Sequence, residues 1–226
     1  MKLLLFDLDG TLILTGGAGT RALERTFEKL YSIREALIDG VKFHGRTDPA
    51  IIRDIFQKSF GRTYSPEESE NICTEYLVFL KEEVKNSPGY TVMPGVRELL
   101  SHLSTRDDIL LGLATGNIEE AAWIKLERSG IGVFFKFGGF GSDSEEREEL
   151  IRAAISRGSK LLGNRVDDKK VFVIGDTPLD IVHGRAVGAL TVAVATGYYS
   201  IKELEKYEPD YLFENFLDFE KVAKIF

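Results

Sequence analysis

The chain is poor in the residues that build disulfide frameworks and zinc sites: it holds one cysteine, Cys73, and three histidines among 226 residues. A single cysteine cannot pair within the chain and cannot make a metal cluster alone. Disulfide-stabilised folds and cysteine-ligated zinc sites are therefore excluded. We expect a reduced, intracellular protein in which Cys73 is a small buried thiol without a catalytic role.

Long hydrophobic runs are also absent. No stretch of about 18 apolar residues occurs, which excludes a membrane-spanning helix. The opening "MKLLLF" resembles the beginning of a signal peptide, but Asp7 and Asp9 interrupt it before it reaches the roughly 7–15 apolar residues of a secretory segment. We therefore expect a cytoplasmic protein with no membrane partner.

The chain has no excess of basic residues. Its 29 lysines and arginines are outnumbered by 36 dispersed acidic residues, which gives a formal net charge of −7. Such a chain lacks the basic footprint of a nucleic-acid-binding protein. The composition, 43% hydrophobic and 29% charged, is that of a globular protein. Its length fits one large domain or one domain with a smaller partner, and nothing in it indicates an oligomeric state.

Short apolar runs alternate with helical patterns along most of the chain. The runs lie at residues 3–6, 109–113, 171–174 and 191–194, with weaker ones at 133–137 and 211–213. The helical patterns lie at residues 96–103, 118–129, 145–162 and 178–187. Short runs without strict alternation are typical of parallel strands buried on both faces. Their alternation with helices predicts an α/β fold, a Rossmann-like parallel sheet with helices on both faces.

The chain between the first and second apolar runs has a different, helical pattern. "TDPAIIRDIF" places Asp48 before a proline, which predicts a helix with Asp48 as its N-cap. In "SPEESENICTEYLVFLKEEV", Ser65 and Glu68 have the spacing of a capping box. The sequence therefore predicts two domains: an α/β core formed by residues 1–14 and 91–226, and a small all-helical domain, residues 15–90, inserted after the first strand.

In an open α/β sheet, ligands bind outside the carboxyl ends of the strands. Polar residues and glycines follow the predicted strands at this place: Asp7, Asp9 and Thr11; Thr115, Gly116 and Asn117; Gly175, Asp176, Thr177 and Asp180; Thr196 and Gly197. Turns alone also favour aspartate, glycine and asparagine. However, carboxylates and hydroxyls that follow three different strands and converge on one edge predict a shared site.

Asp7 and Asp9 are separated by one residue, so in an extended segment their side chains face the same side. Together with Asp176 and Asp180 they would form a cluster of negative charge that resists burial. A divalent cation would relieve this repulsion and would screen an incoming phosphate from the carboxylates. Oxygen ligands without cysteine or histidine favour Mg²⁺ over zinc.

Three stretches taken together resemble motifs of the haloacid dehalogenase superfamily. "DLDGT" resembles its first motif, "LATGN" its second and "GDTPLD" its fourth, in that order, and the similarity covers nearly the whole chain. The helical insertion resembles the cap domain of the phosphoglycolate phosphatase-like branch. The resemblance implies a Mg²⁺-dependent phosphatase that hydrolyses a small phosphorylated metabolite through an aspartyl phosphate.

The resemblance also implies roles for individual residues. Asp7 would be the nucleophile that attacks phosphorus. Asp9 would donate a proton to the leaving oxygen and later take one from the attacking water, which requires unlike environments for the two carboxyl groups. Thr115 would hydrogen-bond the phosphoryl oxygens, and Gly116 and Asn117 would complete the substrate-binding group. The metal would be held by Asp7, the backbone carbonyl of Asp9, Asp176 and Asp180, the last directly or through water.

The third motif of the superfamily is usually a lysine, and here the sequence departs from the pattern. The expected region, "GSDSEEREELIRAAISRGSK", contains a single lysine, Lys160, toward the end of a predicted helix. Arg147 begins that helix and lies nearer the predicted strand edge. We therefore expect Arg147 to supply the positive charge, because arginine can bridge a carboxylate and a phosphoryl group. The alternative for Arg147 is a solvated side chain among glutamates.

Two questions stay open in the sequence. In "FHGRTDPA", Arg46 and Thr47, with their neighbours His44 and Asp48, either contact the substrate or form a plain loop and helix cap. The function is that of a phosphatase, of a phosphomutase for sugar phosphates that uses the same two aspartates, or of a binding or regulatory member that lost turnover. Asp9 argues against a dehalogenase, which lacks the second acid.

Overall fold

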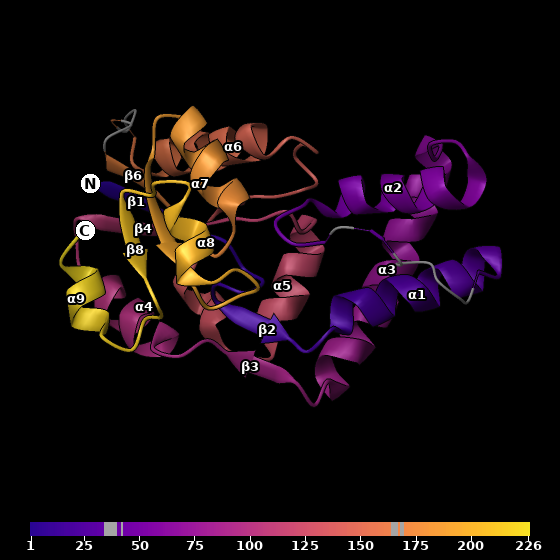
Figure 1. The fold of residues 1–226 in the computed structure, drawn as a ribbon, viewed down its shortest axis with the longest axis horizontal. Helices are drawn as coiled ribbons and strands as arrows, with labels where there is room; N and C mark the ends of the chain where they lie inside the picture. The colour runs from indigo at the N-terminus through magenta and orange to yellow at the C-terminus, as the bar shows by residue number, and fades with distance from the viewer. Residues whose placement is uncertain (34–39, 42, 164–166, 168–169) are drawn as a thin grey trace.

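The computed structural model describes the chain apart from residues 34–39, 42, 164–166 and 168–169 (Figure 1). Its centre is a six-stranded sheet in the order β5-β4-β1-β6-β7-β8, in which every neighbouring pair is parallel. The strands are β1 (Lys2–Phe6), β4 (Ile109–Ala114), β5 (Gly138–Gly139), β6 (Val171–Gly175), β7 (Leu190–Val194) and β8 (Tyr211–Phe213). The predicted Rossmann-like sheet is confirmed.

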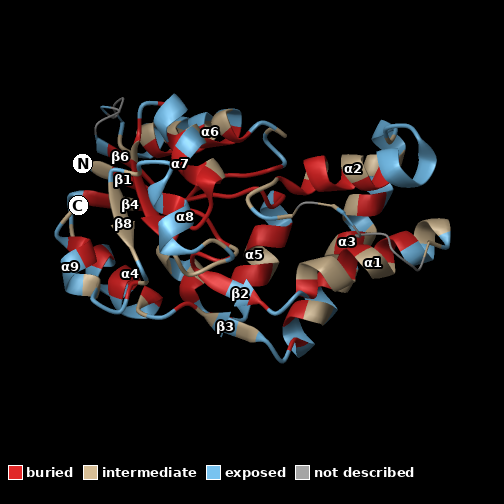
Figure 2. Ribbon diagram, viewed as in Figure 1, coloured by how far each residue is buried: buried red, intermediate tan, exposed pale blue. Residues whose placement is uncertain are grey.

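Helices cover both faces of this sheet. They are α4 (Val96–Ser104), α5 (Glu119–Glu127), α6 (Arg147–Leu161), α7 (Pro178–Ala186), α8 (Ile201–Glu205) and α9 (Phe219–Ala223). Alternate residues of β1 show the division: Leu4 and Phe6 pack in the cluster that contains residues of α4 and α9, whereas Leu3 and Leu5 pack against α6. Figure 2 shows the strands buried between helices whose outer faces are exposed. Burial on both faces explains why these strands lack alternation.

The expected strand at residues 133–137 is wrong. A 3₁₀ helix, η1 (Ile131–Phe134), occupies most of this run, and the edge strand β5 is formed by the two glycines that follow. A Cβ added at Gly139 would lie 1.8 Å from the carbonyl oxygen of Leu150, so α6 packs against the strand too closely for any side chain there. Close packing against α6, rather than hydrophobic pattern, therefore places this strand.

Three helices form a separate helical unit, defined here as α1 (Ala18–Tyr31), α2 (Asp48–Phe60) and α3 (Pro66–Asn86). It lies to one side of the sheet (Figure 1). The chain enters and leaves it through an antiparallel pair, β2 (Ile13–Thr15) and β3 (Tyr90–Val92). Its own hydrophobic cluster includes Phe27, Phe56 and Leu80, together with Ala121 of α5 and Ile118, the residue before that helix. The unit is thus packed against the part of the core that follows β4.

Of the two helix caps predicted from the sequence, the one of α3 is confirmed and the one of α2 is wrong. The capping box of α3 is confirmed: the Glu68 amide donates to Ser65 Oγ at 3.2 Å, and the Ser65 amide donates to Glu68 Oε2 at 2.8 Å. The N-cap of α2 is Thr47, not Asp48. The Asp48 carboxylate instead accepts from the Ile118 amide at 2.9 Å, so it joins α2 to the core rather than capping its own helix.

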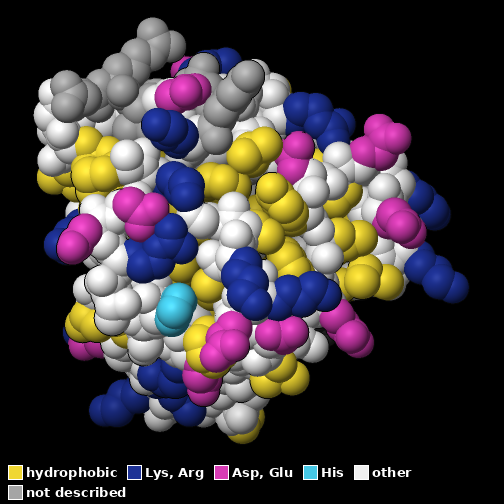
Figure 3. All heavy atoms as spheres, turned by 90° about the vertical axis from the view of Figure 1, so that its left-hand side faces the viewer, with side chains coloured by type: hydrophobic (Ala, Val, Ile, Leu, Met, Phe, Trp, Pro, Cys, Tyr) yellow, Lys and Arg dark blue, Asp and Glu magenta, His cyan; other side chains and the backbone are white. Residues whose placement is uncertain are grey.

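The face of the core opposite the helical unit carries acidic and basic side chains interspersed with hydrophobic ones (Figure 3). Arg106 and Lys2 both pair with Asp108 on the exposed surface, at 2.8 and 3.7 Å. Within the described part of the chain, no helix is long and apolar enough to cross a membrane. On the face shown in Figure 3, acidic and basic residues are mixed rather than separated by sign.

Candidate active site

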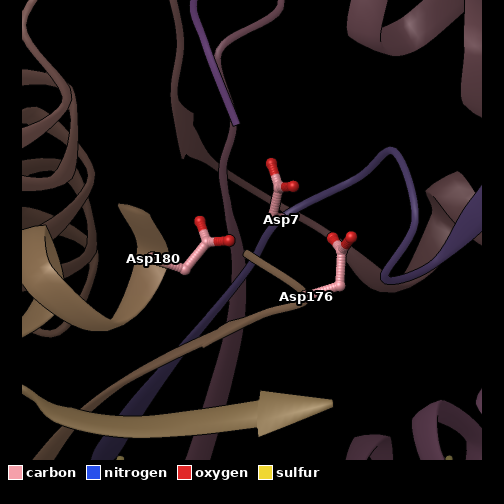
Figure 4. Close-up of side chains that lie close together, drawn as sticks. All are labelled: Asp7, Asp176 and Asp180. Atoms are coloured by element: carbon pink, nitrogen blue, oxygen red, sulfur yellow. The ribbon is translucent and has the colours of Figure 1, made fainter. Parts of the chain in front are cut away.

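Three carboxylates meet at the carboxyl edge of the sheet. Asp7 follows β1, Asp176 follows β6, and Asp180 lies in the first turn of α7. Each offers an oxygen within 4.8 Å of the others, and the side chains point toward one another (Figure 4). All three side chains are buried, with relative exposures of 5% or less. The parallel topology brings these residues together because neighbouring strands end at the same edge.

Small neighbours hold Asp176 in a fixed position. Thr11 Oγ1 donates to Asp176 Oδ1 at 2.9 Å. A Cβ added at Gly197 would lie 1.8 Å from Asp176 Oδ2, and one at Gly10 would lie 2.4 Å from the same atom. Gly10 also has φ +92°, a conformation that side chains rarely adopt. The glycines of "DLDGT" and "TVAVATG" therefore make room for this carboxylate.

The electrostatics of the cluster favour a bound cation. Burial, together with the neighbouring charge of Asp180, raises the pKa of Asp7 to about 7, although Arg147 partly opposes the shift. Burial, followed by the neighbouring charge of Asp7, likewise raises the pKa of Asp176 well above its usual value. A divalent cation among these oxygens would favour their charged forms, and an all-oxygen donor set fits a hard ion. The residues present therefore fit a metal site.

Arg147 lies inside the cluster. Its guanidinium is 5% exposed, its Nη2 is hydrogen-bonded to Asp180 Oδ1, and the same nitrogen lies 3.8 Å from Asp7 Oδ1. Its Nε is buried without a hydrogen-bond partner among the residues that the structure describes. Lys160 is exposed and lines a different surface pocket with Phe137 and Arg157. The positive charge beside Asp7 is therefore that of Arg147.

A second group of polar side chains surrounds Asp9. Asn117 Nδ2 donates to Asp9 Oδ2 and to Thr115 Oγ1, both at 2.8 Å. The ammonium of Lys125, on α5, contacts Asp9 Oδ2 at 2.6 Å and Asn117 Oδ1 at 2.5 Å. Lys125 is 5% exposed, and its pKa is raised because Asp9 and Asp48 together outweigh the effect of burial. Asp9 is thus held by an amide and an ammonium.

The sequence interpretation missed Lys125, although a signal was present. It lies four residues after Ala121 and seven after Ile118, both of which are buried. This spacing puts the lysine on the buried face of α5. A lysine on a buried helical face requires a partner, because burying an unpaired ammonium is costly.

The loop before α2 closes over these groups. Asp48 donates its amide to the Gly116 carbonyl at 2.7 Å, and the Gly45 carbonyl accepts from Arg147 Nη1 at 2.8 Å. A Cβ on Gly116 would lie 2.2 Å from the Arg46 carbonyl oxygen, so only glycine permits this approach. The helical unit therefore touches the second motif and the candidate third-motif arginine through its backbone.

The sequence leaves open whether Arg46 and Thr47 of this loop contact the substrate or form a plain loop and helix cap. The Arg46 guanidinium pairs with Asp54, and the residue lines the central cavity. Thr47 lies in a neighbouring pocket, where its hydroxyl caps α2 and contacts the Glu145 carbonyl at 3.2 Å. His44 lines the central cavity and stacks on Tyr198 of the core with ring centroids 4.3 Å apart. Most of these contacts therefore hold the loop against α2 and the core.

A cavity of about 180 Å³ lies between the helical unit and the sheet edge. Its core wall contains Asp7, Asp9, Thr115, Gly116, Asn117, Lys125, Arg147 and Asp176. Its wall on the helical unit contains Gly19, Leu23, Phe43, Asp48, Ile51 and Tyr76, among others. Predicted site residues from three strand ends therefore line one small cavity, whereas Asp180 lies outside its lining.

The packing of this loop against the core can be tested by substituting Gly45. Gly45→Ala would place a methyl 2.7 Å from Thr177 Oγ1, so we expect it to keep the loop from closing and to lower activity about tenfold or more. Gly40→Ala is the matched control: Gly40 also has positive φ, +74° against +73°, but among the described residues nothing lies within 4 Å of its added Cβ. Equal activity losses in both variants, measured as kcat/KM, would contradict the docking argument.

Comparison with known proteins agrees with this geometry. A family model described as haloacid dehalogenase-like hydrolase matches residues 4–194. A pyrophosphatase PpaX from Oceanobacillus iheyensis is 27% identical over 222 residues, covering 96% of this chain and 94% of the relative. A phosphoglycolate phosphatase from Aquifex aeolicus is 26% identical over 203 residues, covering 89% of this chain and 88% of the relative.

Solved structures share the fold over the whole chain. A hydrolase from Pseudomonas syringae superposes with a TM-score of 0.71 at 21% identity, covering 100% of this chain and 99% of that one. A structure from Bacteroides vulgatus, named as a candidate β-phosphoglucomutase, gives a TM-score of 0.69 at 21% identity, with coverage of 99% and 88%. At this identity the likeness concerns the fold alone.

Proposed function

Because the chain belongs to the haloacid dehalogenase-like hydrolase family, we propose that it is a Mg²⁺-dependent phosphatase of small phosphate monoesters. The observation that carries the proposal is the position of Asp7. Its buried carboxylate lines the cavity, with Arg147 Nη2 at 3.8 Å on one side and Asp176 on the other. A nucleophile, a fixed cation and a metal-binding carboxylate thus border the same space.

The residues divide the reaction between them. Asp7 attacks phosphorus and becomes an aspartyl phosphate, which water then hydrolyses. Arg147 binds the phosphoryl oxygens with its nitrogens, including the buried Nε that has no partner among the described residues. Thr115 donates to the same oxygens. Mg²⁺, held by Asp7, Asp176, the Asp9 carbonyl and the neighbouring Asp180, would neutralise charge that otherwise repels phosphate.

Asp9 serves as the general acid and base in this proposal. Lys125 and Asn117 both contact Oδ2 of Asp9 at the cavity wall, so Oδ1 is the oxygen that would carry the proton for the leaving group. The predicted domain of residues 15–90, which contains the helical unit, acts as a cap that closes the cavity and excludes bulk water during attack on phosphorus. Its entry passes through Gly16 and Gly17, both with positive φ.

The direct test is a phosphatase assay over sugar phosphates, phosphoglycolate, nucleotides and pyrophosphate, with Mg²⁺ and with EDTA. We expect release of inorganic phosphate that requires the metal. A phosphomutase uses the same two aspartates, and it would pass the phosphoryl group from Asp7 to a second hydroxyl of the sugar instead of to water. Isomerised sugar phosphate without free phosphate would therefore contradict the phosphatase proposal, as would full activity in EDTA.

The metal site also has a readout that does not depend on turnover. Burial and the neighbouring charge of Asp180 raise the pKa of Asp7 in the metal-free folded protein from 3.8 to about 7. The stability from this group is therefore complete below pH 3.8 and is lost as the pH rises through 7. Mg²⁺ binds the ionised carboxylate, which prevails only above this pKa. We therefore expect Mg²⁺ to raise the melting temperature of the protein more at pH 8 than at pH 5.

Asp176→Asn provides the matched comparison for this prediction. It keeps the shape of the side chain but removes one charge from the cluster, so the Mg²⁺-dependent rise in melting temperature should largely disappear. Differential scanning fluorimetry at the two pH values measures both effects. An equal rise in the wild type and in Asp176→Asn would place the metal elsewhere.

A further inference from the structure

The hydroxyl of Tyr76 borders the cavity on the side of the helical unit. The residue belongs to α3, is 1% exposed and lines the cavity opposite the sheet edge. A tyrosine hydroxyl that lines a cavity can donate one hydrogen bond to a bound ligand. The space in front of it is therefore suited to a ligand oxygen.

Gly19 keeps this space open. A Cβ added at Gly19 would lie 3.5 Å from the Tyr76 hydroxyl oxygen and 3.6 Å from Lys125 Nζ. The hydroxyl and the ammonium therefore border the same small volume, which we call the distal corner (Gly19, Tyr76 and Lys125). Since Lys125 contacts Asp9, the proposed acid for the leaving oxygen, the distal corner lies on the leaving-group side of the cavity.

The charge balance of the distal corner favours a neutral ligand group. The Lys125 ammonium is already bound to the Asp9 carboxylate and to the Asn117 carbonyl oxygen. Asp48 adds a second buried carboxyl to this wall of the cavity. Burial raises the pKa of Tyr76 well above its usual value, and the charges of Asp48 and Asp9 add to the shift, so the hydroxyl stays protonated beside the negative charge of these two carboxyl groups. A carboxylate or a second phosphate would add to that charge.

The rest of this wall limits the size and polarity of the leaving group. Leu23, Phe43 and Ile51 supply apolar surface beside the hydroxyl. The whole cavity holds about 180 Å³, part of which the phosphoryl group must occupy. A short carbon skeleton with one oxygen directed at Tyr76 satisfies the shape and the hydrogen bond together.

We propose that Tyr76 is a specificity-determining residue that binds a neutral hydroxyl of the leaving alcohol, so that the substrate is the monophosphate of a short polyol. The proposal rests on the phosphatase function and narrows it. The Tyr76 hydroxyl donates to the oxygen of the leaving alcohol, and the absence of a side chain at Gly19 leaves room for that oxygen.

Three phosphate esters of matched size test the proposal. Ethyl phosphate carries no polar group on its second carbon, 2-hydroxyethyl phosphate carries a hydroxyl there, and phosphoglycolate has a carboxylate in that place. In the wild type, we expect kcat/KM for 2-hydroxyethyl phosphate to exceed that for ethyl phosphate about 3- to 10-fold, the value of one neutral hydrogen bond. Phosphoglycolate should be a poorer substrate than 2-hydroxyethyl phosphate. Tyr76→Phe should bring the ratio of hydroxyethyl to ethyl ester close to one.

Two further variants separate binding from structure. Gly19→Ala fills the distal corner with a methyl at ordinary contact distances and suits a helix, so it should fold and should also lower the ratio. Tyr64→Phe is the matched control, because Tyr64 belongs to the helical unit but its hydroxyl lies 3.5 Å from the Pro49 carbonyl, outside the cavity lining. It should keep the wild-type ratio.

The outcomes distinguish this proposal from the phosphatase function. A wild type that hydrolyses none of the three esters but releases phosphate from another ester with Mg²⁺ would overturn the short-polyol substrate, whereas a wild type that releases phosphate from no ester of the wider screen would contradict the phosphatase function itself. A wild type that hydrolyses them with a ratio that Tyr76→Phe leaves unchanged would overturn the assignment of Tyr76 alone. A preference for phosphoglycolate over 2-hydroxyethyl phosphate would overturn the neutral leaving group.

Discussion

Asp7→Asn is expected to abolish phosphate release, with a loss of roughly 10⁴-fold or more in kcat, as for other enzymes that lose their nucleophile. The amide is nearly isosteric with the carboxylate but cannot form an acyl phosphate. Phosphate release by the variant and the wild type, measured with the same ester at saturating Mg²⁺, provides the comparison. Turnover at a tenth of the wild-type rate would contradict the assignment of Asp7 as the nucleophile.

The same variant carries its own folding control. Removing the Asp7 charge relieves the repulsion from Asp180 and Asp176 in a buried cluster, so the variant should unfold at the same or a higher temperature than the wild type without metal at pH 8. A difference of one kcal/mol shifts the melting temperature of a chain of this length by about 2–4 °C. An inactive variant that is also unfolded would say nothing for the assignment of Asp7 as the nucleophile. An inactive variant that stays folded supports the assignment.

Arg147→Ala is expected to lower kcat about 10²- to 10³-fold, the usual cost of removing a group that stabilises the transferring phosphoryl oxygens. The arginine is buried beside Asp7 and paired with Asp180, so its loss also leaves two carboxylates without their cation. Arg147→Lys should recover part of the rate, because lysine restores the charge but not the planar fork of donors.

Lys160→Ala provides the control for the third motif. Lys160 is exposed and lines a pocket that contains none of the three clustered aspartates, so its removal should leave kcat and KM near the wild-type values. All three variants should be assayed with one phosphate ester. A damaging Lys160→Ala together with a silent Arg147→Ala would show that the third motif is misplaced.

Much of the site could be predicted because parallel strands place their carboxyl ends at one edge. Asp7 and Asp176 follow β1 and β6, which are direct neighbours in the sheet, and this neighbourhood follows from the fold class. The preference for Arg147 over Lys160 rested on their positions at opposite ends of one predicted helix. The structure places Arg147 Nη2 3.8 Å from Asp7 Oδ1. Position along the helix was sufficient because α6 begins at that edge.

Other features depend on contacts between distant segments and could not be predicted. Asp48 has the sequence of an N-cap, yet its carboxylate accepts from Ile118 of the core, 70 residues away in the chain. Tyr76 follows the apolar spacing of α3 and would be taken for a core residue, because its place at the cavity is evident only when the cavity is known. Strand β5 forms at Gly138–Gly139 because α6 packs closely there, which no hydrophobic pattern reports.

The central claim is that Asp7 carries the phosphoryl group between the substrate and water. The measurement that tests it most directly is acid quenching of the enzyme during turnover of a phosphate ester, reduction with borohydride, and mass spectrometry of the peptide that contains residue 7. Borohydride reduces an acyl phosphate to an alcohol, so we predict homoserine at position 7 in the wild type and none in Asp7→Asn. Reduction at a different residue, or an unmodified Asp7 under conditions of steady turnover, would contradict the account.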